Sequence, residues 1–256
     1  MAGLRFAYLG SGSRGNGLLV ESADTAVLVD CGFSIAETER RLLRLGREPR
    51  QLAAVLVTHE HSDHIQGVGR FARRHGLPVW MTAGTKAAGR CTEHDDVRLF
   101  SVHGAFAIDG LHIQPFPVPH DAREPSQFVF GDGARRLGLL TDAGSSTPHI
   151  EECLSGLDAL VLECNHDLHM LAGSRYSPLL KRRVGGRFGH LSNHQAGALL
   201  AALDCRGLQH LVAAHLSQEN NTPDLARQTL AAALGCAPEW IAIADQDRGM
   251  DWRELA

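Results

Sequence analysis

The chain has 256 residues, of which 44% are hydrophobic, and its formal net charge is −4. This length and composition allow one large hydrophobic core and exclude an intrinsically disordered chain. The mildly acidic balance argues against nucleic-acid binding through the field of the whole protein, although a local basic patch would suffice for it. We expect a single domain over residues 1–256.

The sequence shows no targeting or membrane segment. No apolar run approaches the roughly 18 residues of a transmembrane helix, and the N-terminal residues lack a signal-peptide pattern. The six cysteines are far apart and form no C-x-x-C motif, which is typical of reduced thiols in the cytosol. We therefore expect a cytoplasmic protein that does not contact membranes. The sequence does not indicate an oligomeric state.

The first part of the chain alternates apolar runs with turn residues. The strands expected here cover residues 4–9, 18–21, 26–30, 53–58 and 78–81. A glycine-rich loop, Gly10–Gly17, joins the first two, and it is either a phosphate cradle or a plain turn. Ser34 and Glu37 have capping-box spacing, which predicts a helix that ends at Gly46 and places Leu42, Leu43 and Leu45 on one side.

The middle of the chain predicts a helix over 65–75 that stops at Gly76, and a short helix from Thr82 through Ala88. Strands of a second sheet are expected at 97–101, 105–108 and 111–118. A hairpin of 127–130 with 136–140 surrounds the turn Gly131–Gly133.

The last part alternates helices and strands. The helices expected here end near Leu154 and cover 176–184, 193–203 and 223–234, and the strands cover 159–163, 209–214 and, as the last one, 240–244. Two runs of strands, each followed by helices, predict an α/β (α+β) protein with two sheets packed face to face and helices outside.

Six residues between an apolar strand and a helix concentrate metal-binding chemistry: His59-Glu60-His61-Ser62-Asp63-His64. Imidazole and carboxylate are ligands that zinc, manganese and iron accept. On a tight loop, His59 and His61 can point at one metal, and Asp63 and His64 at a second. A zincin helix, H-E-x-x-H, is excluded because Asp63 stands where its second histidine is required.

Three distant residues, His120, Asp142 and His215, each follow an apolar strand. Taken singly, a histidine at a strand end is usually a surface residue, and Asp142 before Ala143-Gly144 is a typical turn aspartate. Strand ends at one edge of two sheets can converge, however. Together with the six-residue cluster, these three side chains complete a set of ligands for two metals.

The pattern His-x-His-x-Asp-His resembles the motif of the metallo-β-lactamase superfamily. The resemblance implies a four-layer αββα sandwich with two divalent metals. The matching ligands are His59, His61 and His120 for the first metal, Asp63, His64 and His215 for the second, and Asp142 as the bridging carboxylate. Asp30 matches the buried aspartate that orients ligand histidines. Its alternative role is that of a cap at the end of a strand.

Asp142 narrows the choice among the branches of the superfamily, because true β-lactamases of this fold have cysteine at that position. The chain leaves no room for the C-terminal domain of glyoxalase II or for the insertion of β-CASP nucleases, and it lacks the His-Glu-Ala-Thr segment of RNase Z. A more specific resemblance is to the bacterial YycJ (WalJ)-like group. It is carried by Gly10–Asn16, Thr58–His64, Val118–Asp121, Thr141–Gly144, Glu163–Asp167, Gly189–Asn193 and His215–Ser217. It implies a hydrolase with 5′→3′ exonuclease activity on DNA.

The mechanism that this resemblance implies uses a hydroxide shared by two metals, either zinc or manganese with iron as the alternative, to attack a phosphodiester. Asp63 or Asp142 would orient that hydroxide, and His190 is the candidate proton donor to the leaving oxygen. The expected partner is nucleic acid, DNA in the first place, or a small phosphodiester. Candidate substrate-binding residues are Asn16, Asn165, His166, Asn193, Arg183 and Arg187. The basic run at 181–183 is either a backbone-binding surface or a solvated helix face.

Two other functions use the same ligands. The first is an ester, thioester or lactone hydrolase, because acyl chemistry can use the same pair of metals. The second is a non-hydrolytic protein, either a metal-dependent regulator or a di-iron redox protein. The absence of a flavodoxin-like segment in this sequence argues against the redox form.

Overall fold

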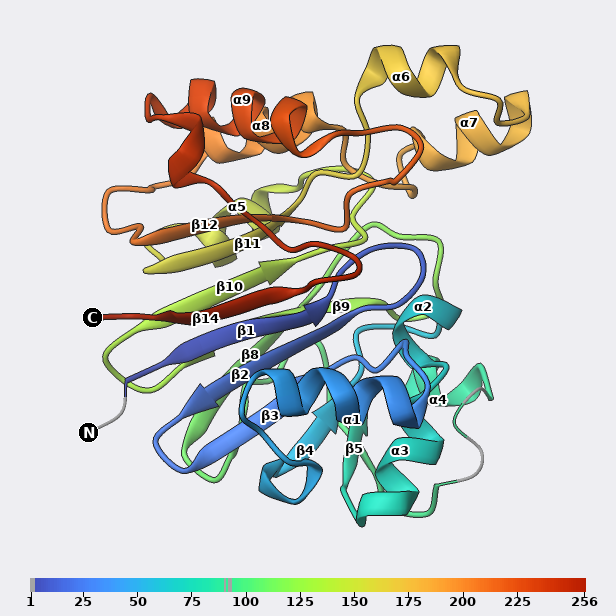
Figure 1. Ribbon diagram of the computed structural model, residues 1–256, viewed down its shortest axis with the longest axis vertical. Helices are drawn as coiled ribbons and strands as arrows, with labels where there is room; N and C mark the ends of the chain where they lie inside the picture. Colours follow the sequence, from blue (N-terminus) through green and yellow to red (C-terminus); the bar gives the residue numbers. More distant parts are fainter. Residues whose placement is uncertain (1–2, 90, 92–93) are drawn as a thin grey trace. The chain divides into compact units, whose positions relative to one another are not determined.

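The computed structural model describes residues 3–89, 91 and 94–256. The chain divides into two compact units, which we describe in turn (Figure 1). Unit 1 comprises Met1–Pro117, Ala122–Arg136 and Asp245–Ala256, and unit 2 comprises Val118–Asp121 and Leu137–Ala244.

Unit 1 contains a seven-stranded mixed sheet among its described residues, in the order β14-β1-β2-β3-β4-β5-β6. The strands are β1 (Arg5–Gly10), β2 (Gly17–Ser22), β3 (Thr25–Val29), β4 (Ala54–Leu56), β5 (Val79–Met81), β6 (Val97–Leu99) and β14 (Met250–Glu254). Neighbours are antiparallel from β14 to β3 and parallel from β3 to β6. The carboxyl ends of β3, β4 and β5 therefore lie at one edge of the sheet.

The helices of unit 1 are α1 (Ile35–Arg44), α2 (Ser62–Ile65), α3 (Val68–His75) and α4 (Ala83–Ala87), with a 3₁₀ turn, η1, at Pro49–Gln51. Ser34 caps α1, as predicted, by accepting a hydrogen bond from the Glu37 backbone N–H. Gly76 ends α3 in the left-handed conformation, with φ of 67°, which glycine adopts without a steric penalty. Leu42 of α1 and Phe71 of α3 are fully buried in one core with residues of the sheet.

Unit 1 also contains three antiparallel strands of a second sheet, β7 (Phe106–Ile108), β8 (Leu111–Pro117) and β9 (Ser126–Gly131). Trp80 of β5 stacks on Phe106 of β7 with ring centroids 4.8 Å apart. Phe100 contacts Phe128 of β9 edge to face, at 5.7 Å. The first sheet thus packs against these strands on one face and against helices on the other, so β2 and β3 are buried along their whole length.

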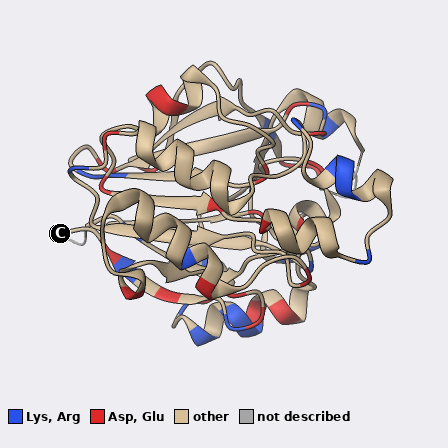
Figure 2. Cartoon of the chain, turned by 90° about the horizontal axis from the view of Figure 1, so that it is seen from above, with Lys and Arg blue, Asp and Glu red and all other residues tan. Residues whose placement is uncertain are grey.

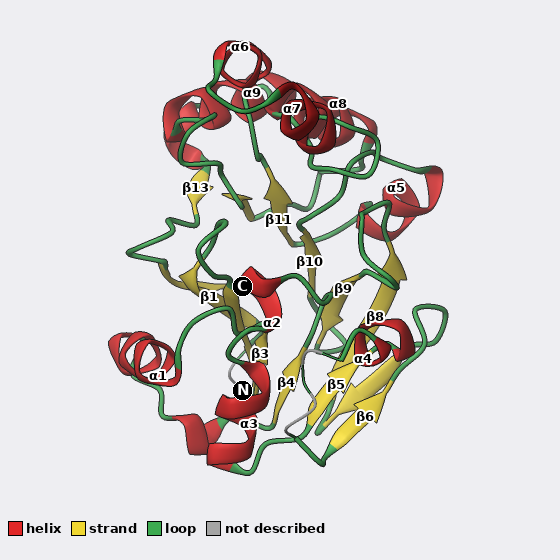
Figure 3. Cartoon of the chain, turned by 90° about the vertical axis from the view of Figure 1, so that its right-hand side faces the viewer, coloured by secondary structure: helices red, strands yellow, loops and turns green. Residues whose placement is uncertain are grey.

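The strands of unit 2 are parallel: β10 (Arg136–Leu140), β11 (Ala159–Glu163), β12 (His210–Ala214) and β13 (Ala242–Ile243). The first residue of β10, Arg136, is counted in unit 1. Parallel neighbours need crossover segments, and helices provide them. These are α5 (Pro148–Leu154), α6 (Leu168–Gly173), α7 (Pro178–Val184), α8 (Asn193–Ala202) and α9 (Pro223–Leu234), followed by a 3₁₀ turn, η2, at Pro238–Trp240. Figure 3 shows α8 and α9 on the same side of β11.

Both sheets are mixed, because the second contains the antiparallel strands β7 to β9 and the parallel strands β10 to β13. The predicted α/β class, with two mixed sheets packed face to face and accompanied by helices, is confirmed. None of the helices in the described part of the chain has the length and hydropathy that crossing a membrane requires.

Several predicted elements need correction. Leu43 is 70% exposed, whereas Leu42 and Leu45 are buried, because adjacent helical positions point about 100° apart. The helix predicted over 65–75 is two helices: α2 begins already at Ser62, and the chain bends at Gly67 before α3. A Cβ at Gly67 would lie 2.0 Å from the Phe33 carbonyl oxygen, so a close backbone approach requires glycine at the break.

Sheet membership also differs from the prediction. The strand expected at 97–101 pairs with β5 in the first sheet rather than belonging to the second. The strand expected at 240–244 is only β13, and it is not the last one, because β14 follows and pairs with β1. α6 was not predicted, although Asp167 caps it by accepting from the Met170 N–H.

Candidate metal centre

In unit 1, the ligand cluster follows β4 and is held by a carboxylate that follows β3. Because β3 and β4 are parallel neighbours, Asp30 lies beside Thr58. The Thr58 N–H donates to Asp30 Oδ1 (2.9 Å) and the Thr58 hydroxyl donates to Oδ2 (2.8 Å). His64 Nδ1 lies 2.8 Å from the same Oδ2. Buried Asp30 therefore fixes the His64 ring through Nδ1, and Nε2 is the ring atom that could hold a metal.

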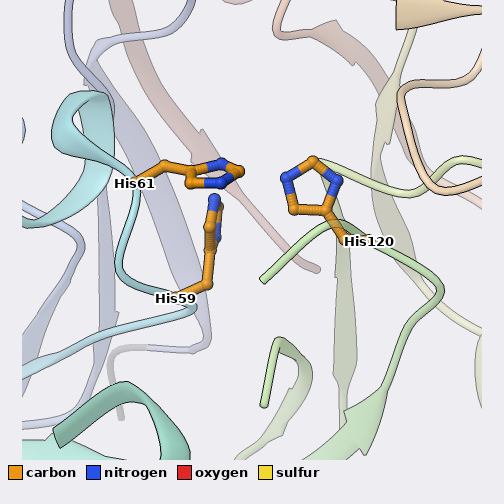
Figure 4. Close-up of side chains that lie close together, drawn as sticks. All are labelled: His59, His61 and His120. Atoms are coloured by element: carbon orange, nitrogen blue, oxygen red, sulfur yellow. The ribbon is translucent and has the colours of Figure 1, made fainter. Parts of the chain in front are cut away.

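The imidazoles of this cluster are packed together. The His59 ring lies 4.6 Å from that of His61, edge to face, and 4.3 Å from that of His64. Figure 4 shows His59 and His61 on the loop after β4, and His120 on the loop after β8. Asp63 and His64 lie within α2 rather than on a loop, and His61 is the N-cap of that helix.

The glycine-rich loop of unit 1 packs directly on this cluster. The Asn16 side-chain amide lies 3.1 Å from His64 Nε2 and 3.4 Å from Asp63 Oδ2, and its carbonyl oxygen accepts from the Gly12 N–H at 2.8 Å. A Cβ at Gly32 would lie 1.9 Å from the Asp63 carbonyl oxygen. Asn16 is buried, so it ties the loop to the cluster.

In unit 2, three acidic or imidazole side chains stand at the carboxyl ends of neighbouring parallel strands. Asp142 follows β10, Glu163 ends β11 and His215 follows β12. Ligand atoms of these three residues and of His190 all lie within 4.8 Å of one another. Carboxyl ends of parallel strands share one edge, which explains how residues 73 positions apart in sequence meet there.

Two histidines of unit 2 point the same ring atom at Asp142. His120 Nε2 lies 3.9 Å and His215 Nε2 3.7 Å from Asp142 Oδ1. Their opposite nitrogens are held, His120 Nδ1 by the Gly189 carbonyl at 3.0 Å and His215 Nδ1 near Glu163 Oε1 at 3.3 Å. Ligand histidines characteristically bind metal through one nitrogen while a carbonyl or carboxylate holds the other. The donor set of unit 2 therefore fits a divalent metal.

Glu163 belongs to one of the segments that carry the family resemblance, Glu163–Asp167, and the sequence assigns it no role of its own. It is fully buried, and its Oε2 accepts from the backbone N–H groups of Ala143 (3.1 Å) and Leu191 (2.9 Å). Its Oε1 lies 2.8 Å from His190 Nδ1. The sequence offered one signal for this role, a carboxylate at the end of a strand with a polar run after it. The partners of Glu163 lie 20 to 28 residues away and could not be identified from the sequence.

The Glu163–His190 pair stabilises its own charged form. Burial opposes ionisation of Glu163, but the charge of His190 and the hydrogen bonds from His190 and His215 hold its pKa at about 2. Burial likewise disfavours a charged His190, yet the Glu163 carboxylate raises the pKa of His190 above its usual range. Glu163 thus favours the protonated form of His190 and anchors its Nδ1.

Asp30, Asp142 and His215 share an uncommon backbone conformation, with φ of 61°, 51° and 55°. Positive φ is strained for most residues, is better tolerated by Asp, Asn and His, and is concentrated at functional sites. The two other non-glycine residues with positive φ in the described chain are Ala23 and Asp109, outside these clusters. Each of the three residues lies one or two residues after the end of a strand, so the left-handed conformation recurs at three strand ends.

The structure divides the residues predicted to bind substrate into buried and exposed groups. Asn165 is buried and donates to the His215 carbonyl (3.1 Å), so it positions that backbone. Asn193 is buried and its side chain pairs with the side chain of Asn221 (2.9 Å). His166 is fully buried, and its ring nitrogens have no hydrogen-bond partner among the described residues; burial lowers its pKa. Arg183 and Arg187 are exposed.

Asp30→Asn is expected to weaken metal binding by about 10- to 100-fold, because the amide cannot accept from both Thr58 and His64 as the carboxylate does. Losing a buried charge-assisted acceptor should also lower the free energy of unfolding by about 1–3 kcal/mol. Metal titration and urea unfolding measure the two effects. Asp24→Asn, at an exposed hairpin turn of the same unit, is the matched control. Unchanged metal affinity in Asp30→Asn would remove Asp30 from the centre.

Comparison with known proteins agrees with this geometry. The family model "Beta-lactamase superfamily domain" matches residues 25–216, so the chain belongs to the metallo-β-lactamase-fold hydrolases. It is similar to exodeoxyribonuclease YycJ of Bacillus anthracis, with 36% identity over 239 residues that cover 91% of this chain and 89% of the relative. It is also similar to exodeoxyribonuclease WalJ of Streptococcus pneumoniae, with 32% identity over 258 residues, 98% of this chain and 93% of the relative.

A solved structure supports the fold. The metallo-β-lactamase-fold protein YhfI of Bacillus subtilis aligns with a TM-score of 0.76 at 20% identity, covering 98% of this chain and 99% of that one. The predicted membership of the superfamily and the likeness to the YycJ and WalJ group are confirmed. Membership implies a hydrolase that binds divalent metal.

Proposed function

We propose that the protein is a dinuclear metal-dependent phosphodiesterase that digests DNA from its 5′ end. The observation that carries the proposal is the pair of anchored imidazoles, His120 and His215, that aim Nε2 at one oxygen of Asp142. A carboxylate faced by two such nitrogens has the chemistry of a bridge between two cations. Support for the substrate comes from two relatives named as exodeoxyribonucleases that align over nearly the whole chain.

The proposed ligands are those named from the sequence. They are His59, His61 and His120 for one ion, Asp63, His64 and His215 for the other, and Asp142 for both. Zinc and manganese both accept this mixture of imidazole and carboxylate, with iron as the alternative. Bound at these residues, the ions would supply Lewis-acid polarisation of a phosphoryl oxygen and a nucleophilic water at neutral pH.

His190 is the proposed proton donor to the leaving sugar oxygen. Phosphodiester hydrolysis breaks a P–O bond to an alkoxide, and a nearby acid that protonates the alkoxide lowers the barrier. His190 Nδ1 is anchored to Glu163, so Nε2 is the atom that would deliver the proton. Burial of Glu163 makes it a fixed support, comparable to the carboxylate that orients the base of a catalytic triad.

A panel of substrates and metals tests the proposal. Purified protein loaded with zinc or manganese is expected to shorten 5′-phosphorylated DNA and to hydrolyse bis(p-nitrophenyl) phosphate, and chelation should abolish both reactions. A 3′-labelled strand would report the direction of digestion. Hydrolysis of acyl-thioesters or lactones with no cleavage of any phosphodiester would replace the proposal with acyl chemistry. Metal binding without turnover of either class would indicate a non-hydrolytic protein.

A further inference from the structure

One segment of unit 2 carries a charge opposite to that of the rest of the chain. Residues 168–190 contain Arg175, Lys181, Arg182, Arg183 and Arg187 and no Asp or Glu. The formal net charge of −4 is therefore +5 in this segment and −9 elsewhere. Figure 2 shows the basic stretch as a blue turn on the helix at the right, α7. A polyanion is thus attracted to this segment and repelled by the rest of the chain.

The segment is a hairpin of α6 and α7 followed by a glycine-rich loop. Lys181 of α7 donates to the Ala172 carbonyl of α6 at 2.6 Å, which fixes one helix to the other. Arg183 pairs with Asp121 at 2.6 Å. Arg175, Arg182 and Arg187 are exposed, and none of them has an ion pair among the described residues. Three cations are thereby available for phosphates.

The loop that follows α7 is fixed against the ligand loops of unit 2. The Phe188 carbonyl accepts from the Asp121 N–H at 3.0 Å, and the Gly189 carbonyl holds His120 Nδ1. A Cβ at Gly144 would lie 2.4 Å from the Arg187 carbonyl oxygen, so the loop that carries Asp142 packs on this backbone without space for a side chain. The backbone at Phe188 is therefore set in relation to His120 and Asp142.

The Phe188 side chain itself faces solvent. It is 55% exposed, and the Arg187 guanidinium lies 5.9 Å from its ring centroid. Phe188 stands two residues before His190, so their Cα atoms are at most about 7 Å apart. An exposed aromatic ring on a fixed backbone, flanked by arginines, is the platform on which proteins stack unpaired bases of a single strand.

We infer that Phe188 stacks on an unpaired base next to the attacked phosphate, while Arg182 and Arg187 hold the phosphates of the same strand. The inference rests on the proposed function and specifies its substrate as a single-stranded or frayed DNA end. Inside a duplex every base is stacked on both faces and only the two terminal pairs expose one, so a duplex gains mainly the phosphate contacts.

Exposed leucines on the same hairpin, Leu168 and Leu179, would also suit an anionic lipid surface. Nucleic acid is the better fit because the exposed ring of Phe188 stands two residues before His190, and because its backbone is fixed by the loops that carry His120 and Asp142. Binding to vesicles is therefore an outcome of the test that contradicts the inference.

The test uses the full chain with its metals and a phosphorothioate oligonucleotide that resists hydrolysis, measured by fluorescence anisotropy as a single strand and as a blunt duplex. Phe188→Ala is expected to weaken single-strand binding about tenfold, from the size of base–aromatic stacking, and Phe188→Trp should retain it. Duplex binding should change less than about twofold, since stacking is confined to the two terminal pairs. Arg182→Ala should weaken both and lower the salt slope for the single strand by about 0.7.

Matched controls come from unit 1, where Leu43 is 70% exposed on α1 and Arg253 is exposed on β14. Leu43→Ala and Arg253→Ala should leave single-strand binding unchanged. Equal binding of Phe188→Ala and the unchanged chain, or competition by phosphatidylserine vesicles, would overturn the inference. Hydrolysis of bis(p-nitrophenyl) phosphate distinguishes failure of the inference from failure of the proposed function. If the ester is hydrolysed but Phe188→Ala binds single strands normally, only the inference fails. If no phosphodiester is cleaved, the proposed function fails.

Discussion

Asp142→Ala is expected to lose one metal equivalent and nearly all hydrolytic activity while the fold persists. Asp142 Oδ1 is the oxygen near which His120 and His215 both place Nε2, and alanine removes this oxygen from a position that is only 2% exposed. Activity should fall by at least about 100-fold, because residues that merely orient ligands are already worth about 10- to 100-fold. Metal analysis of the purified protein and kcat for bis(p-nitrophenyl) phosphate measure the two effects.

The backbone at Asp142 calls for a second variant. With φ of 51°, alanine adds strain of its own, whereas asparagine tolerates this conformation. Asp142→Asn should therefore match the unchanged chain in thermal stability and match Asp142→Ala in lost activity. If both variants retained full metal content and turnover, Asp142 would have no place in the centre.

His190→Ala is expected to slow DNA hydrolysis by about 10²- to 10⁴-fold, the usual contribution of a positioned acid. The loss should be much smaller for bis(p-nitrophenyl) phosphate, because nitrophenolate is an activated leaving group that departs without a proton. Metal content should stay unchanged, since His190 is a proposed donor and not a ligand. The ratio of the two losses, measured on one preparation, tests the role of His190 as proton donor. Equal losses on the two substrates would contradict that role.

Glu163→Gln examines the support of that donor. The amide oxygen can still accept from the backbone N–H groups of Ala143 and Leu191, but the side chain loses the charge that raises the pKa of His190. We expect Glu163→Gln to slow DNA hydrolysis more than hydrolysis of bis(p-nitrophenyl) phosphate, as His190→Ala does, but with a smaller loss of rate. Equal losses on both substrates, together with lost metal, would instead make His190 a metal ligand, as its place within 4.8 Å of Asp142 and His215 allows.

The sequence predicted those parts of the centre whose information is local. His59 to His64 stand together after an apolar strand, and motif spacing alone indicated their chemistry. His120, Asp142 and His215 were predicted because each follows a strand, and in unit 2 parallel pairing brings the ends of β10 and β12 to one edge. The fold class followed from the same alternation of strands and helices.

What the sequence did not show depends on tertiary contacts. The role of Glu163 required knowledge that Leu191 and His190 return to it from a loop 27 residues later. The start of α2 at Ser62 lacks a capping side chain, since His61 at the N-cap makes no cap hydrogen bond. β14 is a strand with only Met250 buried along its first four residues, so it carries no apolar run that a pattern search can find. Leu43 shows that apolar residues adjacent in a helix need not share a face.

The left-handed turns at Asp30, Asp142 and His215 bear on how such a protein evolves. Each position is constrained twice, by the atom it presents and by a conformation that costs most other side chains about 1–3 kcal/mol. Glycine and asparagine adopt this conformation with little strain, but they do not present the original carboxylate or imidazole atom. A lineage that abandons hydrolysis can therefore keep the scaffold intact through these two replacements, and descendants of this kind should be stable, folded and catalytically silent.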